Sequence, residues 1–200
     1  ITDNRGGIAT LARLNADGSI DSSFAAPVFD SAGGNLFAPP VVDAAGRILI
    51  SGTFSTVNGV SRPRVARLNA DGSLDLAFVP AGFTVGGTTQ VRGVAIQSVG
   101  VNAGKILVAG GPLTVAEFNR PVIRLNPDGS LDATFTLSTQ TEAGMATRPR
   151  LLHLHADDSY SIVGATIARF GANGVADATL TRPVFTQAAG ANEQFWIAIA

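Results

Sequence analysis

The sequence predicts an all-β fold made of about four repeated units, and three observations lead to it. Hydrophobic residues make up 46% of the 200 residues and charged residues 14%, which is typical of a globular protein. No window shows a sustained apolar period of 3.6 residues, so essentially no helix is expected. One motif containing an Asp-Gly turn recurs along the chain, and short apolar stretches lie between its copies.

The repeated motif reads arginine, an apolar residue, an Asn-x-Asp-Gly turn, and a second short strand that ends near a phenylalanine. Three copies are well kept and the fourth is degenerate, with Leu180 in place of the phenylalanine. The turn glycines of successive copies lie 54, 57 and 45 residues apart. The copies span residues 12–24, 66–78, 123–135 and 168–180, with turn glycines Gly18, Gly72, Gly129 and Gly174.

A looser motif lies before three of these copies, at residues 41–54, 94–110 and 152–164. Each reads as an apolar strand, a short turn and a second alternating strand. One unit therefore has four strands in roughly 50 residues, which is the content of one propeller blade. We interpret residues 1–200 as a single repeat domain or fragment, with a partial further copy at 188–200. The predicted fold is a β-propeller-like array of about four degenerate four-stranded antiparallel blades.

The blades either close into a ring or stack openly, and the sequence leaves both arrangements open. In a closed ring, residues 1–10 would be joined with residues 195–200. The chain opens with Ile1 and has no initiator methionine, so we expect a processed or excised fragment.

The Asp-Gly turn predicts the pairing of the strands beside it. Asn, Asp and Gly in this order are typical of a type I turn that ends in a left-handed glycine, the three-residue hairpin loop. This register places Asn15 opposite Ser19 and Arg13 opposite Asp21. Cross-strand ion pairs of this kind contribute about 0.2–1 kcal/mol each, so they fix register more than they stabilise. The predicted structural pairs are Arg13 with Asp21, Arg67 with Asp75, Arg124 with Asp132, and Arg169 with Asp177.

The motif RLNxDGSLDxxF, preceded by strands such as GRILISG (46–52) and GKILVAG (104–110), resembles the delta-60 repeat of large exported bacterial proteins. The resemblance covers nearly the whole chain. It implies a β-propeller within a multidomain surface or secreted protein, and it implies no defined enzymatic activity. The last third departs from the pattern, because Asp157-Asp158 replaces a glycine turn there.

Calcium is an alternative use of the same turn, because its oxygen side chains have the spacing of a calcium loop. Turn chemistry explains every residue without a metal, however, and the loop lacks a later bidentate glutamate. We therefore expect no cofactor, with calcium as the alternative. The candidate ligands are Asn15, Asp17, Asp21, Asn69, Asp71, Asp75, Asn126, Asp128 and Asp132.

Two further patterns are weighed against plainer interpretations. His153, His155 and Asp157 alternate along a predicted strand, so they would share one face as half a metal site, or face solvent. Residues 100–106 resemble a phosphate-binding loop, but the repeat places Gly104-Lys105 in a hairpin turn, so we reject that interpretation.

Enzymatic activity is not expected. No Gly-x-Ser-x-Gly elbow occurs, and the two histidines lie on one degenerate strand. Most carboxylates belong to the repeat, which leaves Glu117, Glu142 and Glu193 as candidates for a glycosidase pair.

Composition limits the partners. The net charge is −1 and no basic stripe occurs, so nucleic acid is not expected. The absence of cysteine excludes disulfides and thiolate metal sites. No apolar stretch reaches the roughly 18 residues of a membrane span. Arg-Pro recurs at 62–63, 120–121, 148–149 and 182–183, where a structural role at strand starts is favoured over an arginine face for an anionic surface glycan.

We therefore expect a non-catalytic extracellular structural or interaction module of a bacterial surface or secreted protein, with neighbouring domains or copies of itself as partners. One alternative is a self-assembling filament subunit joined by exchange of terminal strands, which include the hydrophobic run around Trp196. The other is a carbohydrate- or calcium-binding propeller.

Overall fold

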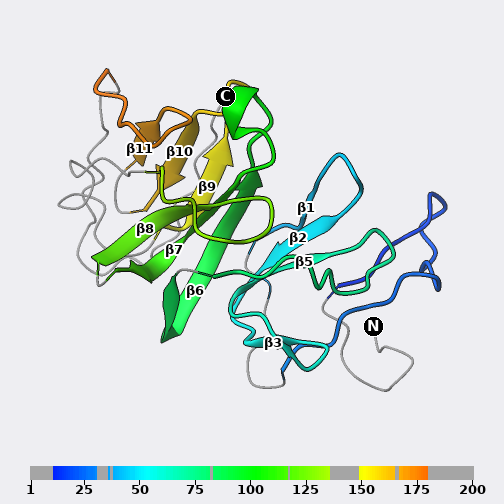
Figure 1. The fold of residues 1–200 in the computed structure, drawn as a ribbon. Helices are drawn as coiled ribbons and strands as arrows, with labels where there is room; N and C mark the ends of the chain where they lie inside the picture. Colours follow the sequence, from blue (N-terminus) through cyan, green and yellow to red (C-terminus); the bar gives the residue numbers. More distant parts are fainter. Residues whose placement is uncertain are drawn as a thin grey trace, which may run out of the picture.

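The computed structural model describes residues 11–30, 36, 38–81, 83–116, 118–135, 149–164 and 167–179. These residues form small antiparallel sheets that follow one another along the molecule in chain order (Figure 1). The helical structure among them is a single 3-10 turn, Gly100–Asn102. No helix in the described ranges has the length and apolar character needed to cross a bilayer. The predicted all-β class is confirmed, and the partial copy at 188–200 and both chain ends lie outside the described residues.

Three of the sheets have three strands each, in the orders β1-β2-β5, β6-β7-β8 and β9-β10-β11. Every neighbouring pair is antiparallel. A separate hairpin joins β3 to β4 through Asn58 and Gly59, whose φ angles of 52° and 77° are those of a tight hairpin turn. The strands are β1 Val41–Val42, β2 Ile48–Ser51, β3 Thr56–Val57, β4 Val60–Ser61, β5 Val65–Leu68, β6 Thr84–Ile96, β7 Ile106–Val115, β8 Phe118–Leu125, β9 Leu151–Leu154, β10 Tyr160–Val163 and β11 Ile167–Phe170.

The motif turn, Asp-Gly in three copies and Asn173-Gly174 in the fourth, has the predicted register in all four copies. In the first copy, Asn15 N–H donates to the Ser19 carbonyl over 2.8 Å and Asp21 N–H donates to the Arg13 carbonyl over 2.9 Å. Gly18 has a φ of 83°, the left-handed conformation that glycine adopts without steric cost. The equivalent bridges join Leu14 with Ile20, Leu68 with Leu74, Leu125 with Leu131, and Phe170 with Ala176.

The fourth strand of each blade is shorter than predicted, because it is reduced to that single bridge. The motif aspartate ends it: in the first copy, Asp21 Oδ1 accepts hydrogen bonds from the Ser23 N–H at 2.9 Å and the Ser23 hydroxyl at 2.6 Å. Such local side-chain bonds offer the backbone an alternative to the ladder. The chain therefore turns away after two or three residues and proceeds to the next repeat.

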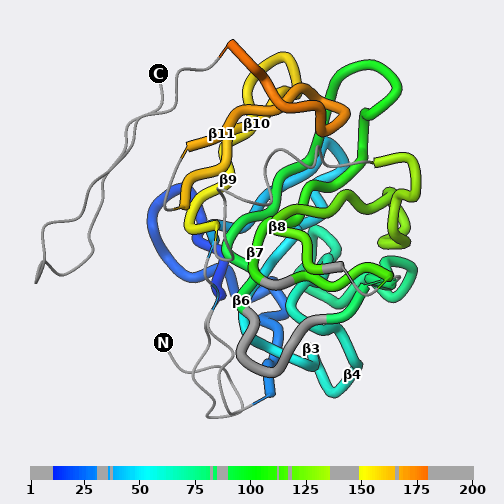
Figure 2. The backbone as a smooth tube through the Cα atoms, turned by 90° about the vertical axis from the view of Figure 1, so that its left-hand side faces the viewer, coloured from blue at the N-terminus to red at the C-terminus, as the bar shows by residue number. Residues whose placement is uncertain are grey.

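The core lies between consecutive repeats, because each central strand buries both of its faces. On β2, Leu49 packs toward the second sheet, whereas Ile50 packs toward Phe24 of the first repeat. On β7, Val108 faces the first sheet and Leu107 faces the third. This is the alternation expected of a strand between two layers. Figure 2 shows the second sheet between the first and the third.

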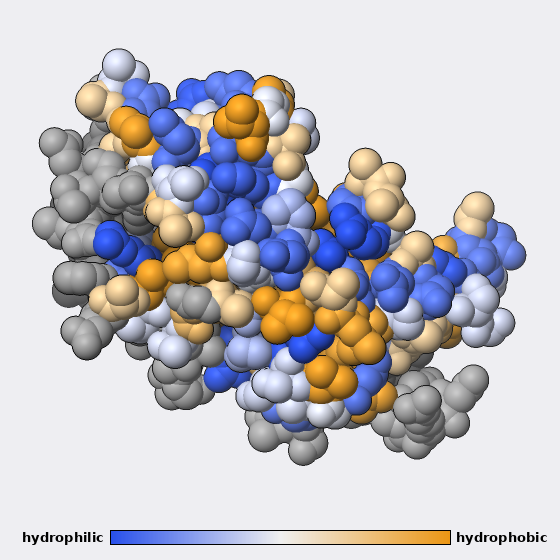
Figure 3. All heavy atoms as spheres, viewed as in Figure 1, coloured by the Kyte–Doolittle hydropathy of each residue, from blue (hydrophilic) through white to orange (hydrophobic). Residues whose placement is uncertain are grey.

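Some large hydrophobic side chains remain at the surface. Figure 3 shows hydrophobic residues gathered near the middle of one face, between the two ends of the array. At the turn of the first repeat, Leu14 is 57% exposed and Ile20 is 54% exposed. The equivalent Leu68 and Leu125 are fully buried, so among the described residues this leucine is covered in the second and third repeats and is more exposed in the first.

Close packing between repeats predicts different costs for the same substitution at two turn glycines. Gly72 and Gly18 have similar φ angles, so alanine carries a similar backbone cost at both, about 1–2 kcal/mol. A Cβ at Gly72 would also lie 2.5 Å from the Ala25 carbonyl oxygen and 2.8 Å from the Phe24 ring, whereas a Cβ at Gly18 meets nothing within 4 Å. We expect Gly72→Ala to lower the free energy of unfolding by about 1–3 kcal/mol more than Gly18→Ala in urea denaturation. Equal losses would contradict the packing of Phe24 on this turn.

Candidate functional site

The motif arginine joins three partners at once. Arg67 Nε donates to Asp75 Oδ2 over 2.7 Å, and its guanidinium lies 4.7 Å from the centre of the Phe78 ring. Its Nη1 then donates over 2.6 Å to the carbonyl of Pro127, in the turn of the next repeat. One side chain thus fixes its own hairpin and the neighbouring repeat. The same three contacts are made by Arg13 with Asp21, Phe24 and Ala70, and by Arg124 with Asp132, Phe135 and Ala172.

We call this set of contacts between one motif and the next Asp-Gly turn a repeat joint. A backbone bond accompanies it at the first two joints: Ala25 N–H donates to the Asp71 carbonyl over 2.7 Å, and Val79 N–H donates to the Asp128 carbonyl over 2.8 Å. Because the residue after the phenylalanine makes this bond, the connection to the next sheet also holds the two repeats together.

Burial of the ion pair increases from the first joint to the third. The side chains of Arg13 and Asp21 are 40% and 18% exposed, whereas those of Arg124 and Asp132 are 3% and 4% exposed. Lys105 Nζ lies 2.7 Å from Asp132 Oδ2 and adds a second cation there. Burial alone raises the pKa of Asp132, but hydrogen bonds from Lys105, Thr134 and Arg124 outweigh it and hold that pKa far below its ordinary value.

The structure does not bring the fourth predicted pair together. Asp177 N–H donates to the Arg169 carbonyl over 2.8 Å, so the backbone register is as predicted. The Arg169 guanidinium instead donates to Ser159 Oγ over 3.1 Å and lies 3.8 Å from Asp157 Oδ2. The physical reason lies in the neighbouring turn, where Ser159 stands at the position that Lys105 occupies in the third repeat. The arginine therefore turns to that neighbour.

The calcium candidates serve the turns as hydrogen-bond acceptors and donors. Asp17 Oδ1 accepts from both the N–H and the hydroxyl of Ser19, which lower its pKa. Asn15 donates its amide to the Ser19 hydroxyl, and Asp21 is bound to Arg13 and Ser23. The described part of the chain contains no cluster of three or more His, Cys, Asp or Glu side chains suited to a metal. The pattern repeats at Asn69, Asp71 and Asp75, and at Asn126, Asp128 and Asp132.

His153 and His155 lie side by side, but Asp157, the third residue of the predicted half-site, does not lie on the same strand. The rings of His153 and His155 are 4.8 Å apart in an edge-on arrangement. His155 Nε2 lies 2.8 Å from Ser161 Oγ. Desolvation by burial, with Arg169 and His153 nearby, lowers the pKa of His155. Asp157 lies in the turn, where it accepts from Ser159, because the strand has already ended at Leu154.

The degenerate turn of the fourth repeat performs a task that the sequence did not reveal. Asp158 adopts a φ of 61° at the position of the turn glycine and is only 1% exposed. Its carboxylate accepts the N–H groups of Ser98, at 2.9 Å, and Val99, at 2.6 Å. These residues begin the longer β6–β7 connection of the third repeat. The aspartate that replaces glycine thus holds a neighbouring loop, and only its pairing in space could reveal this.

The predicted phosphate-loop residues and two of the Arg-Pro pairs lie in turns and strands of the sheets. Gly104 and Lys105 close the hairpin between β6 and β7, as the rejection of a phosphate loop requires. Arg62 is buried and donates to the Ser61 carbonyl, and Arg120-Pro121 lies on β8, an edge strand of its sheet, where proline is tolerated. Glu117, Glu142, Glu193, Arg148, Arg182, Trp196 and residues 1–10 and 195–200 lie outside the described residues.

A cavity of about 290 Å³ lies against β8. Its polar lining includes Arg120, Arg124 and Asp132, and its apolar lining includes Val122 and Phe135. Arg124 and Asp132 are bound to each other within the third joint, so this lining belongs to the joint already described.

Comparison with known proteins agrees with the repeat architecture. The model of the family described as "Domain of unknown function (DUF5122) beta-propeller" matches residues 6–24, 46–78 and 104–135. The matched segments contain the first three motif copies, together with strands β2 to β5 before the end of the second copy and β7 and β8 before the end of the third. No curated protein matches the chain. Together with the sheets described above, this match defines the chain as a β-propeller-type repeat domain.

The burial of the arginine and aspartate side chains at each joint predicts how much that arginine contributes to the free energy of unfolding. Arg67→Met would leave Asp75 buried without its cation, and breaking a buried pair costs about 3–5 kcal/mol. Arg13→Met removes the same three contacts at the more exposed first joint, where we expect a loss of about 1 kcal/mol. Urea denaturation of the two variants measures the difference. Equal losses would show that burial does not set the strength of the joint.

The contact of Asp158 with the third repeat predicts a local effect. Asp158→Gly should relieve the left-handed backbone while removing the acceptor for Ser98 and Val99. We expect hydrogen exchange of these two amides to accelerate about ten- to hundredfold, since bonds to charged groups contribute about 1.5–3 kcal/mol each. Asp157→Asn, in the same turn, is the control and should leave both amides protected. Unchanged exchange in Asp158→Gly would contradict the contact.

Proposed function

We propose that this chain is a non-catalytic structural or interaction module of an exported bacterial protein, carried by repeats of the delta-60 kind. One observation carries the proposal: the polar groups that the motif multiplies are used to join repeats to each other. The arginine, the aspartates and the turn carbonyls bind one another at each joint. Repetition therefore extends a scaffold.

The chemistry of these groups supports a role without catalysis. A general base needs a pKa near the working pH and access to substrate. Hydrogen bonds from Ser73 hold the pKa of Asp71 below its usual value, and those from Lys105, Thr134 and Arg124 do so for Asp132. These carboxylates therefore stay ionised and bound to their partners, as expected of groups with a structural role and not of a general base. Robust hydrolytic turnover that is lost on substituting Glu117, Glu142 or Glu193 would contradict this part of the proposal.

The proposed location outside the cell rests on the delta-60 resemblance and on the cysteine-free composition. The delta-60 repeat occurs in exported multidomain proteins. A chain without cysteine, like this one, is common among exported bacterial proteins. The partners that we propose are neighbouring domains or copies of the chain.

Surface accessibility in the producing bacterium tests this location. A protease that cannot cross membranes should remove the chain from intact cells, as followed with an antibody against it. A cytoplasmic protein in the same cells is the control and should stay intact until lysis. Protection of the chain in intact cells, with cleavage after lysis, would refute the proposed location.

A further inference from the structure

The only two histidines of the chain lie together at the end of β9. His153 is paired across the third sheet with Ser161 of β10. His155 follows two residues later, after β9 has ended, and its Nε2 lies 2.8 Å from the Ser161 hydroxyl oxygen. Ser161, which is buried, therefore lies beside both imidazoles and holds the ring of His155 next to that of His153.

The repeat pattern does not account for this pair. In the first sheet the equivalent positions hold Val41 and Asp43, and in the second sheet they hold Ala95 and Gln97. Ala95 belongs to the core between the second and third sheets, and Gln97 is fully buried. The two imidazoles are therefore particular to the third sheet among the described residues, and they are not needed to build a blade.

The separation of the two rings fits a pair of imidazoles bound to one metal ion. The ring centres of His153 and His155 are 4.8 Å apart, and the ring planes make an angle of 78°. Two imidazole nitrogens that each lie about 2.0–2.1 Å from one metal, at an angle of about 90–110°, place their ring centres about 4.5–5.2 Å apart. The rings therefore need little movement to share a metal.

Both nitrogens of His153 and Nδ1 of His155 are available to such an ion. Within the described part of the chain, these atoms make no hydrogen bond, and none of them is a fully buried polar atom. Histidines that bind a metal through one nitrogen almost always use the other in a hydrogen bond that fixes the ring. The Ser161 hydroxyl supplies that bond to His155.

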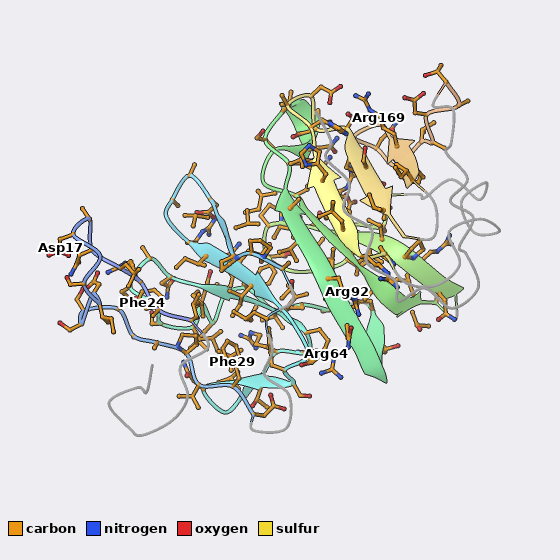
Figure 4. The ribbon with its side chains drawn as sticks, turned by 180° about the vertical axis from the view of Figure 1, so that it is seen from behind. Asp17, Phe24, Phe29, Arg64, Arg92 and Arg169 are labelled. Atoms are coloured by element: carbon orange, nitrogen blue, oxygen red, sulfur yellow. The ribbon has the colours of Figure 1, made fainter. Side chains whose placement is uncertain are left out.

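The charges beside the pair do not disfavour a cation. Arg169 and Asp157 both lie close enough to influence His155. Because Arg169 Nη2 and Asp157 Oδ2 are themselves 3.8 Å apart, these two side chains together add no net charge. Figure 4 shows Arg169 on the third sheet, at the opposite end of the molecule from Asp17.

We propose that His153 and His155 form a binding site for one divalent ion of the late first-row transition metals, the class of Ni²⁺, Cu²⁺ and Zn²⁺. Imidazole nitrogens suit these ions, whereas Ca²⁺ takes oxygen ligands. The site therefore differs in position and in chemistry from the calcium loops considered from the sequence. No third His, Cys, Asp or Glu completes a cluster among the described residues, so water or a group of another molecule takes the remaining coordination positions.

Titration of the untagged chain with Zn²⁺ at neutral pH, followed by nuclear magnetic resonance of the imidazole rings, tests the proposal. Because the chain has only two histidines, every imidazole signal belongs to the pair. We expect the signals of both rings to shift together and to saturate at one Zn²⁺ per chain. Ca²⁺ should shift neither ring, and Cu²⁺ should bind more tightly than Zn²⁺.

Three variants test the roles of the individual side chains. His153→Gln and His155→Gln each remove one ligand, and Ser161→Ala removes the bond that fixes the His155 ring. Each should weaken Zn²⁺ binding about tenfold or more, which is the loss typical even of an outer hydrogen-bond partner. Asp17→Asn is the control, since it changes a turn carboxylate far from the pair and should leave the affinity for Zn²⁺ unchanged.

Far-ultraviolet circular dichroism checks that each variant keeps its sheets. A wild type that does not bind Zn²⁺, a shift confined to one ring, or an unchanged affinity in any of the three variants would overturn the proposal. These measurements do not depend on where the chain is located, so their failure would leave the proposed function standing.

Discussion

The fold depends on the motif arginine of each repeat, whose long side chain contacts both its own hairpin and the next repeat. Within a repeat, Arg67 is bound to Asp75 and lies over Phe78, and its remaining nitrogen donates to the backbone of the next repeat. A planar guanidinium can serve these partners together because its donors point in fixed and different directions. Neighbouring repeats bury the apolar side chains of these three-stranded sheets, and the joint holds each pair of repeats in the position where that packing occurs.

Order along the chain therefore arises from contacts between neighbours. The hydrophobic clusters each combine side chains from two successive repeats, and the central strands β2 and β7 each contribute to two clusters, one on either side. In such an array, stability is approximately the sum of the repeats and their nearest-neighbour contacts. The aspartate that shortens the outer strand is part of this design, because it turns the chain toward the next repeat after one bridge.

The fourth repeat shows how a degenerate copy is accommodated. Asp158 replaces a glycine in a left-handed conformation, which only a few side chains tolerate. Its carboxylate binds the backbone at the start of a connection that is longer in the third repeat, so two departures from the pattern compensate each other. The arginine of the same repeat donates to Ser159 in place of the aspartate that its equivalents bind.

The sequence by itself determined the all-β class, the positions of the motif copies and the register of each motif hairpin. These are local properties, fixed by turn residues and by strand alternation, so Gly18 and its equivalents reveal them without further context. The tertiary structure alone decided which groups meet between repeats. Arg67 with Pro127, and Asp158 with Ser98, are separated by about sixty residues in the chain. No local rule brings such residues together, because their approach depends on how one sheet packs against the next.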